Sequence, residues 1–224
     1  MNTGHNLGET PSLKQQAYDT LLQMMVSGEL KPGTRLTEEE LTKTLNISRA
    51  PIREALNMLE RDGFAKIVPR KGTAVTEVSR KDLKDIWTCR LALEPFAARE
   101  ALPNIPREKL TDCIISLNRL ESEPFDYEKY VASDLAVHDL FYQYLDNSYM
   151  QTILNNLQTH SLRVRWLNEA QLMDTELMTG SVRDHKAIIL ACLEGDPEKV
   201  YNEVYTHVKN SLDRILAVFP EEDG

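Results

Sequence analysis

Two helix-start signals in close succession constrain this chain more than any other feature of its sequence. Thr37 is followed three residues later by Glu40, a capping box in which hydroxyl and carboxylate bind the exposed amides at a helix start. The pattern predicts a helix over residues 38–45. After a short turn, Ser48 is placed to cap a second helix, which Gly63 ends. Two helices joined by a tight turn are therefore expected.

The second helix carries two arginines beside its apolar stripe. Arg49 and Arg53 lie four residues apart, so both guanidinium groups should point the same way near the helix N-terminus. A recognition helix presents its N-terminal residues to base edges in the major groove of DNA, and the arginine fork fits guanine O6 and N7. The stripe expected to be buried consists of Ile52, Ala55, Leu56 and Leu59.

A basic hairpin is predicted after the second helix. Alternating residues over 64–68 and 73–78 indicate two strands joined by the turn PRKG. Gly72 would let the backbone at the tip approach a phosphate or the minor groove, and Arg70 and Lys71 supply positive charge there. The hairpin would form a DNA-contacting wing.

An upstream helix over residues 12–27, followed by Arg35 in a loop, completes this part of the chain. Each piece alone has a simpler explanation, since an arginine pair on a helix is usually a solvated face and a basic turn is usually only a turn. The order of helix, helix, arginine-bearing helix and basic hairpin is much more specific. It predicts a winged helix-turn-helix of three helices and a hairpin.

Residues 12–78 resemble the winged helix-turn-helix domain of the GntR family of bacterial transcription regulators. The matching core is SRAPIREAL, the following LERDGF and the hairpin segment KGTAV, and the resemblance covers about a third of the chain. It implies that five positions contact an operator, namely Arg35, Ser48, Arg49, Arg53 and Gly72.

The net charge of −9 is unevenly distributed. Residues 1–78 hold ten basic and ten acidic side chains, which leaves 16 basic and 25 acidic ones for residues 79–224. Residues 43–72 contain seven basic and three acidic side chains, so the predicted DNA-binding face carries a net positive charge. We expect the acidic second half to be held away from the phosphates.

Composition is that of a soluble protein, with 42% hydrophobic and 27% charged residues. No run approaches the roughly 18 apolar residues that span a bilayer, and no signal peptide is recognised, so we expect a cytoplasmic protein. Cys89, Cys113 and Cys192 are odd in number and lie in apolar helical patterns, which predicts reduced core thiols. Flexible tails are expected at residues 1–11 and 220–224.

The second half, residues 79–219, contains no strand signal and is predicted to be an antiparallel all-α bundle of about six helices. The whole chain is then mainly α. Ser79 with Asp82 starts the first helix, and Asp196 with Pro197 starts the last. The predicted helices cover residues 79–102, 106 onward, 125–145, 148–170, 180–194 and 197–218.

Three histidines and an aspartate of this bundle face inward. His138, His185 and His207 each share an apolar stripe, and Asp134 lies one turn before His138. Imidazoles with one carboxylate form a ligand set suited to zinc, nickel, manganese or iron. Alternatively, each histidine is a hydrogen-bonded core residue that binds no metal. The spacing alone is equally compatible with both interpretations.

Residues 81–218 resemble the FCD effector domain, which follows GntR-type heads in the FadR subfamily. The matching segments are the D-x3-H containing Asp134 and His138, the segment DHKAIILACLEGD and the segment YTHV. The resemblance implies a helical bundle in which an aspartate and three histidines hold a divalent metal, with zinc favoured. Two departures, Val137 at a usually aromatic place and Asp184 at a usual glutamate, could alter the surroundings of the ligands.

The segment WTCRLALEPFAARE resembles the first helix of that domain and implies that Arg90 pairs with a carboxylate effector near the metal. A simpler explanation for Arg90 is an ion pair with Glu94, four residues later on the same helix. On a surface, such a pair stabilises the helix by about 0.2–0.5 kcal/mol.

The resulting hypothesis is a homodimeric transcription regulator, in this family most often a repressor, that reads an inverted repeat and responds to a small carboxylate bound near a metal. Two alternatives are a metal-dependent enzyme acting on a small acid and a helical dimerisation module with structural histidines. An aspartate and histidines around an open metal can activate water, but no general base or nucleophile motif accompanies them. The hypothesis therefore assigns no enzymatic activity.

Overall fold

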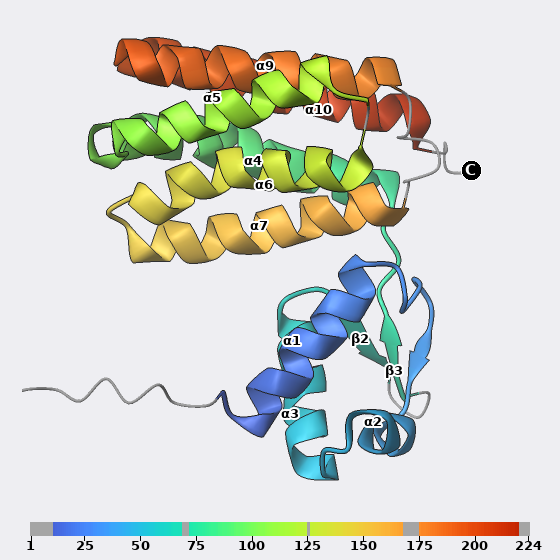
Figure 1. Cartoon of the computed structure of the whole chain (residues 1–224). Coiled ribbons are helices and arrows are strands. Elements are labelled where there is room, and N and C mark those ends of the chain that lie inside the picture. Colours follow the sequence, from blue (N-terminus) through green and yellow to red (C-terminus); the bar gives the residue numbers. More distant parts are fainter. Residues whose placement is uncertain (1–10, 69–71, 125, 168–174, 220–224) are drawn as a thin grey trace, which may run out of the picture. The chain divides into compact units, whose positions relative to one another are not determined.

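A computed structural model describes residues 11–68, 72–124, 126–167 and 175–219 of the 224-residue chain. The chain divides into two compact units, Met1–Glu77 and Val78–Gly224, each with its own hydrophobic core (Figure 1). The units are described separately below.

Across its described residues, 11–68 and 72–77, the first unit contains three helices and a three-stranded sheet (Figure 1). The strand order is β1-β3-β2 and both pairings are antiparallel, with Arg35 opposite Ala74 and Ile67 opposite Thr73. The predicted winged helix-turn-helix fold is confirmed, although the short strand β1 was not predicted and the last strand ends before Val78. The elements are α1 Leu13–Val26, β1 Arg35–Leu36, α2 Glu38–Leu45, α3 Arg49–Arg61, β2 Ala65–Val68 and β3 Gly72–Val75.

Side-chain capping fixes the start of helix α2 but not that of helix α3. The Thr37 hydroxyl accepts the backbone N–H of Glu40, and the Glu40 carboxylate accepts the Thr37 hydroxyl at 2.6 Å instead of a backbone amide. Helix α2 ends at Asn46, whose φ of 53° is left-handed. Ser48 occupies the N-cap position of α3, but its side chain makes no capping hydrogen bond, so that part of the prediction was wrong.

Packing of α1 against α3 forms the core of the first unit. The predicted stripe of α3 is fully buried, as are Leu21 and Met25 of α1 and Phe64 at the start of the hairpin. Because the apolar side chains of α3 face this core, its polar face remains at the surface.

The second unit contains six α-helices among the residues that the structure describes (Figure 1). The predicted helical bundle is confirmed; a short 3-10 turn, η1 Leu102–Asn104, was not predicted, and α9 begins earlier than expected. The helices are α4 Arg80–Ala101, α5 Arg107–Ser122, α6 Tyr127–Tyr144, α7 Ser148–Leu167, α9 Thr175–Glu194 and α10 Pro197–Val218.

Helix α4 is the central element of the bundle and packs against α6, α7 and α10. It starts with a complete capping box, in which Ser79 and Asp82 satisfy each other's backbone amides. Arg80 donates hydrogen bonds to the carbonyls of Leu216 and Phe219, at 3.0 and 2.8 Å, and so fastens the end of α10 to the start of α4.

The cysteines are free thiols, but only Cys192 is a core residue. Cys113 is partly buried and Cys89 is exposed, so the prediction of a core position was wrong for Cys89. Burial raises the pKa of Cys192 to about 12. Within the described part of the chain, no helix combines the length and apolarity that a bilayer crossing requires.

Substitutions at two nearby residues of α5 test which side of that helix faces the core. Leu117 is fully buried, whereas Ile115 is 44% exposed. Leu117→Ala should lower the free energy of unfolding by about 2–5 kcal/mol, because it opens a cavity, and Ile115→Ala by less than about 1 kcal/mol. Urea denaturation of both variants measures the difference; equal losses would contradict this orientation of α5.

Candidate functional site

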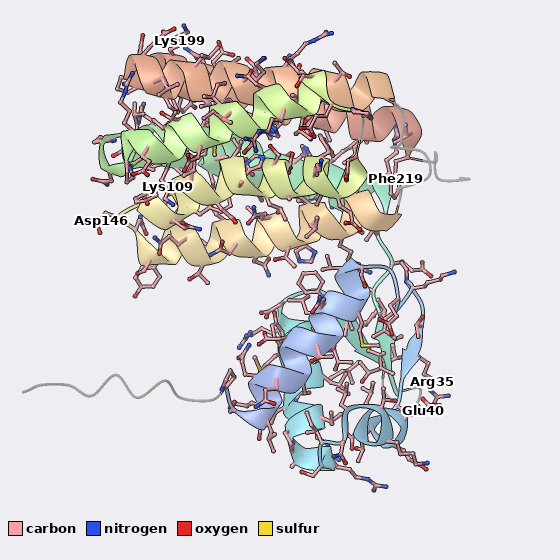
Figure 2. The ribbon with its side chains drawn as sticks, viewed as in Figure 1. Arg35, Glu40, Lys109, Asp146, Lys199 and Phe219 are labelled. Carbon is pink, nitrogen blue, oxygen red and sulfur yellow. The ribbon has the colours of Figure 1, made fainter. Side chains whose placement is uncertain are left out.

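The strand pairing of the first unit brings together two of the predicted DNA-binding residues. Arg35 projects from β1 into solvent (Figure 2), and its guanidinium lies over Gly72 on the paired strand β3. A Cβ built on Gly72 would lie 3.5 Å from Arg35 Nε, and the φ of Gly72, +91°, is one that other residues rarely adopt. A side chain at position 72 would therefore be strained by its backbone conformation, while its Cβ would make only an ordinary van der Waals contact with this arginine.

The two arginines of α3 are both exposed near its N-terminus, as expected, but Arg53 already has a partner. Its Nε and Nη2 donate to the two carboxylate oxygens of Glu38 on α2, at 2.7 and 2.9 Å. Arg53 holds the pKa of Glu38 below its ordinary value. Arg49 forms no ion pair with any residue that the structure describes. Contact of Arg53 with a DNA phosphate would therefore exchange one anionic partner for another.

The remaining predicted positions of this face are Ser48, Arg70 and Lys71. Ser48 is exposed and its hydroxyl is not used in capping, which leaves it available to a phosphate. Arg70 and Lys71 lie outside the described residues, so their role stays a prediction.

Three buried histidines converge in the second unit. His138 of α6, His185 of α9 and His207 of α10 are each at most 3% exposed, and one nitrogen of each lies within 4.8 Å of the others. The Nε2 atoms of His185 and His207 are 3.2 Å apart. Two imidazoles bound to one tetrahedral zinc at about 2.0–2.1 Å would have nitrogens about 3.3 Å apart. The observed spacing therefore fits a shared metal ion.

Carboxylates lie behind two of these imidazoles, and the one behind His138 is within hydrogen-bonding distance. His138 Nδ1 lies 3.2 Å from Glu94 Oε2, and His207 Nδ1 lies 3.6 Å from Asp184 Oδ2. The other nitrogen of His138, Nε2, is buried and has no hydrogen-bond partner within the described chain. Carboxylates in this position fix the tautomer and aim Nε2 at a metal. Asp184 is itself held by Arg214 at 2.8 Å.

Asp134 borders the cluster. It is 2% exposed, and its Oδ1 lies 3.5 Å from His185 Nε2. A buried carboxylate requires cations or several hydrogen-bond donors around it. The structure thus brings together all four residues that the sequence singled out as ligands, as three imidazoles and one carboxylate, a donor set suited to a divalent transition metal.

Protonation states around the cluster suit metal binding, which requires neutral imidazole and ionised carboxylate. Burial lowers the pKa of His207 to about 4, so this ring is neutral at pH 7. Burial alone would raise the pKa of Glu94, but Arg90 and His138 outweigh it and hold that pKa well below its usual range. Arg214 and His207 likewise lower the pKa of Asp184 against the effect of burial.

Arg90, predicted to bind an effector, is engaged with Glu94. Its Nε and Nη2 donate to the Glu94 carboxylate at 2.5 and 3.3 Å, and its guanidinium lies 4.9 Å from the centre of the Trp87 ring. The simpler i+4 pair is therefore present, but both partners are 2% exposed, so it is a core ion pair and not a surface one. Sequence reasoning missed the role of Glu94. The signal was available, since Leu83, Trp87, Arg90, Glu94 and Ala98 follow helical spacing on one buried face.

A small cavity touches the cluster. Its lining includes Arg90 and His138, together with Gln158 of α7, and its volume of about 10 Å³ has room for roughly one water molecule. The remaining lining residues are Asp134, Leu135, Ser161 and Leu162.

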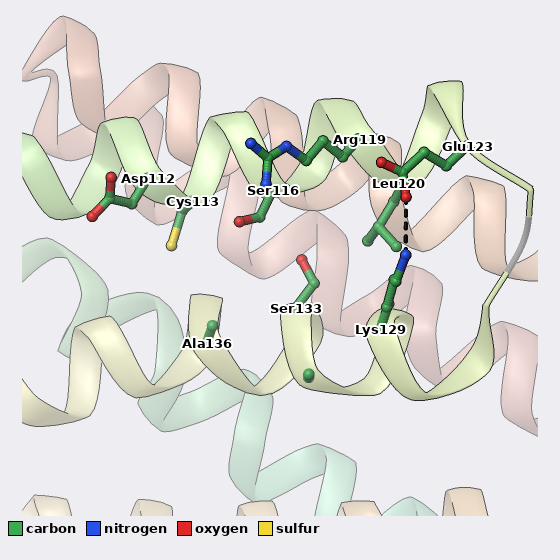
Figure 3. Close-up of a pocket in the computed structure, with 10 residues that line it drawn as sticks. Asp112, Cys113, Ser116, Arg119, Leu120, Glu123, Lys129, Ser133 and Ala136 are labelled. Carbon is green, nitrogen blue, oxygen red and sulfur yellow. Dashed lines mark hydrogen bonds and ion pairs between the residues drawn. The ribbon is translucent and has the colours of Figure 1, made fainter.

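A larger groove of about 440 Å³ lies between α5 and α6 (Figure 3). Lys129 and Glu123 form an ion pair of 3.0 Å at one end of it. None of the histidines lines this groove. Of the two spaces, the smaller cavity is the one that a histidine of the cluster lines.

Comparison with known proteins identifies both units. Residues 13–75 match the model described as "Bacterial regulatory proteins, gntR family", and residues 85–210 match that of the FCD domain. The chain belongs to the GntR family and carries an FCD domain. It is 26% identical over 223 residues to the HTH-type transcriptional repressor RspR of Escherichia coli (strain K12), covering 99% of this chain and 96% of the repressor.

Two further similarities agree with this assignment. The HTH-type transcriptional regulator YdhC of Bacillus subtilis (strain 168) is 26% identical over 209 residues, which is 92% of either chain. The solved structure of E. coli McbR/YncC has a TM-score of 0.78 at 21% identity and covers 93% of this chain and 99% of that chain, so it shares the fold.

This GntR-family chain is a DNA-binding transcription regulator and not an enzyme. The alternative of a metal-dependent enzyme is thereby excluded. FCD domains commonly bind a metal, and the three histidines form a group able to hold one.

The lowered pKa of His207 predicts a pH-dependent stability of the metal-free protein. Between pH about 4 and 6.5 the unfolded chain binds a proton at this ring that the folded chain does not. The contribution of the neutral His207 ring to the free energy of unfolding is thus complete above pH about 6.5. It is lost as the pH falls toward 4. From pH 7 to pH 5 the free energy of unfolding should fall by about 2 kcal/mol.

Urea denaturation in the presence of a chelator measures this loss. His207→Gln should remove most of the dependence, whereas His160→Gln, which changes a histidine outside the cluster, should keep it. An unchanged pH dependence in His207→Gln would show that another group causes it.

Proposed function

We propose that this GntR-family regulator is a homodimeric repressor whose operator binding is controlled by a small carboxylate bound beside a divalent metal ion. The observation that carries the proposal is the convergence of His138, His185 and His207, one of which, His138, lines a small cavity together with Asp134 and Arg90. In this arrangement a bound cation and the Arg90 guanidinium, which is paired with Glu94, would lie close to each other in one buried region.

The proposed metal ligands are Nε2 of the three histidines and a carboxylate oxygen of Asp134. Glu94 would act as a positioning residue for His138, whose Nδ1 it faces at 3.2 Å, and Asp184 would take the same role for His207 by closing its present separation of 3.6 Å. Zinc is the favoured ion, since nitrogen-rich sets of four donors suit it, with nickel, manganese and iron as alternatives. When bound, the ion supplies positive charge that attracts the carboxylate of an effector.

The proposed DNA face is formed by the N-terminus of α3 and the tip of the hairpin. Arg49 and Arg53 would read base edges in the major groove, and Ser48 would bind a phosphate. The remaining proposed contacts, at or near the wing, are Arg35, Gly72, Arg70 and Lys71. Two such faces in a homodimer would match an inverted repeat in cytoplasmic DNA.

Regulation requires that the effector bind one dimer arrangement more tightly than the other, since tight binding to both arrangements changes nothing. In the remaining alternative the histidines are only structural and the second unit merely dimerises the head. Metal content separates the two cases.

Removal of two proposed ligands tests the metal centre. The double variant His138→Ala, His207→Ala should lose the bound metal, because two of the four donors are gone, while His160→Ala should keep one ion per chain. Elemental analysis by plasma mass spectrometry after dialysis measures this. Equal metal content in wild type and the double variant would refute the assigned ligands.

Substitutions in the head test the DNA face. Arg53→Ala should cost about 1–3 kcal/mol of operator binding and relax the preference for specific bases, because a base-reading fork is lost. Lys71→Ala should weaken binding to all sequences more evenly. Fluorescence anisotropy with operator and scrambled DNA compares the two; wild-type binding by both variants would mean that this face does not bind DNA.

A further inference from the structure

We propose that Glu38 is a specificity-determining residue of the DNA-binding face: it stays bound to Arg53 in the complex with DNA and thereby directs that arginine to a guanine and away from phosphates. This inference rests on the proposed function, which assigns base reading to Arg53. It deepens that function by naming the base and the residue that enforces the choice. The geometry of one ion pair between α2 and α3 carries it.

The ion pair occupies one edge of the Arg53 guanidinium and leaves another edge open. Nε and Nη2 donate to the two oxygens of the Glu38 carboxylate, at 2.7 and 2.9 Å. An arginine side chain carries five N–H donors in a fixed planar arrangement, so the remaining donors, on Nη1 and Nη2, are still available. Because these two nitrogens are adjacent, two of their N–H groups lie side by side at the end of the guanidinium. Arg53 can therefore make a second bidentate contact without releasing Glu38.

The open edge of Arg53 matches guanine better than any other base. In the major groove, guanine presents two adjacent acceptors, O6 and N7, whereas adenine presents the acceptor N7 beside the donor N6. Thymine offers a single acceptor in that groove, and cytosine offers a donor. Two N–H groups that are held side by side therefore find two acceptors only on guanine.

The carboxylate of Glu38 makes Arg53 a poor partner for the DNA backbone. A free arginine attracts any phosphate, and such contacts add affinity without sequence information. In the pair the two charges cancel, and a phosphate bound to Arg53 would lie close to a second anion. A guanine is neutral and meets no such repulsion. The pair thus weakens non-specific binding and keeps the base contact, which raises the preference for the correct sequence.

The ion pair is anchored on both sides. Glu38 is the first residue of α2, directly after the cap residue Thr37, and Arg53 lies in the second turn of α3, which packs against α2. The plane of the guanidinium is therefore fixed by two helices before DNA binds, so less side-chain freedom is lost on binding. The hydrogen bonds and charge of Arg53, with the charge of Arg49, lower the pKa of Glu38, so its carboxylate is ionised at neutral pH.

The neighbouring Glu39 provides a matched control in the same helical turn. It pairs with Lys43 of its own helix at 2.9 Å, whereas Glu38 reaches across to Arg53 of α3. Glu38→Gln and Glu39→Gln change the net charge equally, and each removes one carboxylate from the positive end of the α2 dipole. A difference between the two variants in DNA selectivity therefore reports the pair with Arg53.

Fluorescence anisotropy of the full-length protein with two duplexes tests the role of Glu38. One duplex is selected by the wild-type protein from a pool of random sequences, and the other is a scrambled version of it. Glu38→Gln should reduce the ratio of the two affinities by about tenfold, because Arg53 becomes free to bind phosphates. On the scrambled duplex, the plot of log affinity against log salt concentration should steepen by about 0.9. Glu39→Gln should keep the affinity ratio within about twofold of that of the wild type.

Replacement of single guanines by 7-deazaguanine in the selected duplex tests the base. This analogue lacks the N7 acceptor but still pairs with cytosine. At one guanine of each half-site, the replacement should weaken wild-type binding by about tenfold. The same replacement should have no effect on Arg53→Ala, in which the contact is already lost, and Glu39→Gln should respond like the wild type.

The outcomes distinguish this inference from the proposal on which it rests. If Arg53→Ala binds both duplexes like the wild type, the proposed DNA face is wrong at this position, and the inference falls with it. If Arg53→Ala loses selectivity but Glu38→Gln keeps the same affinity ratio as Glu39→Gln, only the inference is overturned. It is also overturned alone if no guanine shows an effect that depends on Arg53. This last comparison does not use Glu38→Gln and so decides the matter even if that variant fails to fold.

Discussion

The packing of the second unit depends on one ion pair that is buried in the middle of its helical bundle. Arg90 and Glu94 lie one turn apart on the central helix α4 and are almost fully enclosed. Removal of either partner would leave an uncompensated buried charge, at a cost of about 3–5 kcal/mol. The same Glu94 carboxylate lies against His138 Nδ1 and so aims the opposite nitrogen of that ring at the cluster. One carboxylate therefore links the packing of α4 to the geometry of the candidate metal centre.

Features set by local chemistry could be predicted from the sequence. Helix α2 spans Glu38–Leu45 as expected, because its ends are set locally, by Thr37 at its start and by Asn46 after its last residue. The start of α10 follows from Asp196, which accepts two backbone amides, and from Pro197 in the first turn. The inward direction of His138, His185 and His207 could also be inferred, since each recurs with apolar neighbours at helical spacing.

Features that depend on tertiary placement could not be predicted. Strand β1 has only two residues and exists because it pairs with β3, which is distant in sequence. The ion pair between Arg53 and Glu38 joins two helices and spans 15 positions in the sequence. Neither helix taken alone contains a pattern that predicts it. Likewise, the sequence showed Glu94 only as a neighbour of Arg90, because its contact with His138 requires α4 and α6 to pack together. Hydrophobic spacing thus indicates which side chains turn inward, while packing decides which of them meet.

X-ray absorption at the zinc edge of the zinc-loaded, full-length protein tests the central claim most directly. The three imidazoles and the Asp134 carboxylate predict only nitrogen and oxygen scatterers at about 2.0–2.1 Å, with the outer-shell pattern of several histidine rings. Sulfur scatterers at about 2.3 Å, or a spectrum of zinc surrounded by water alone, would contradict the account.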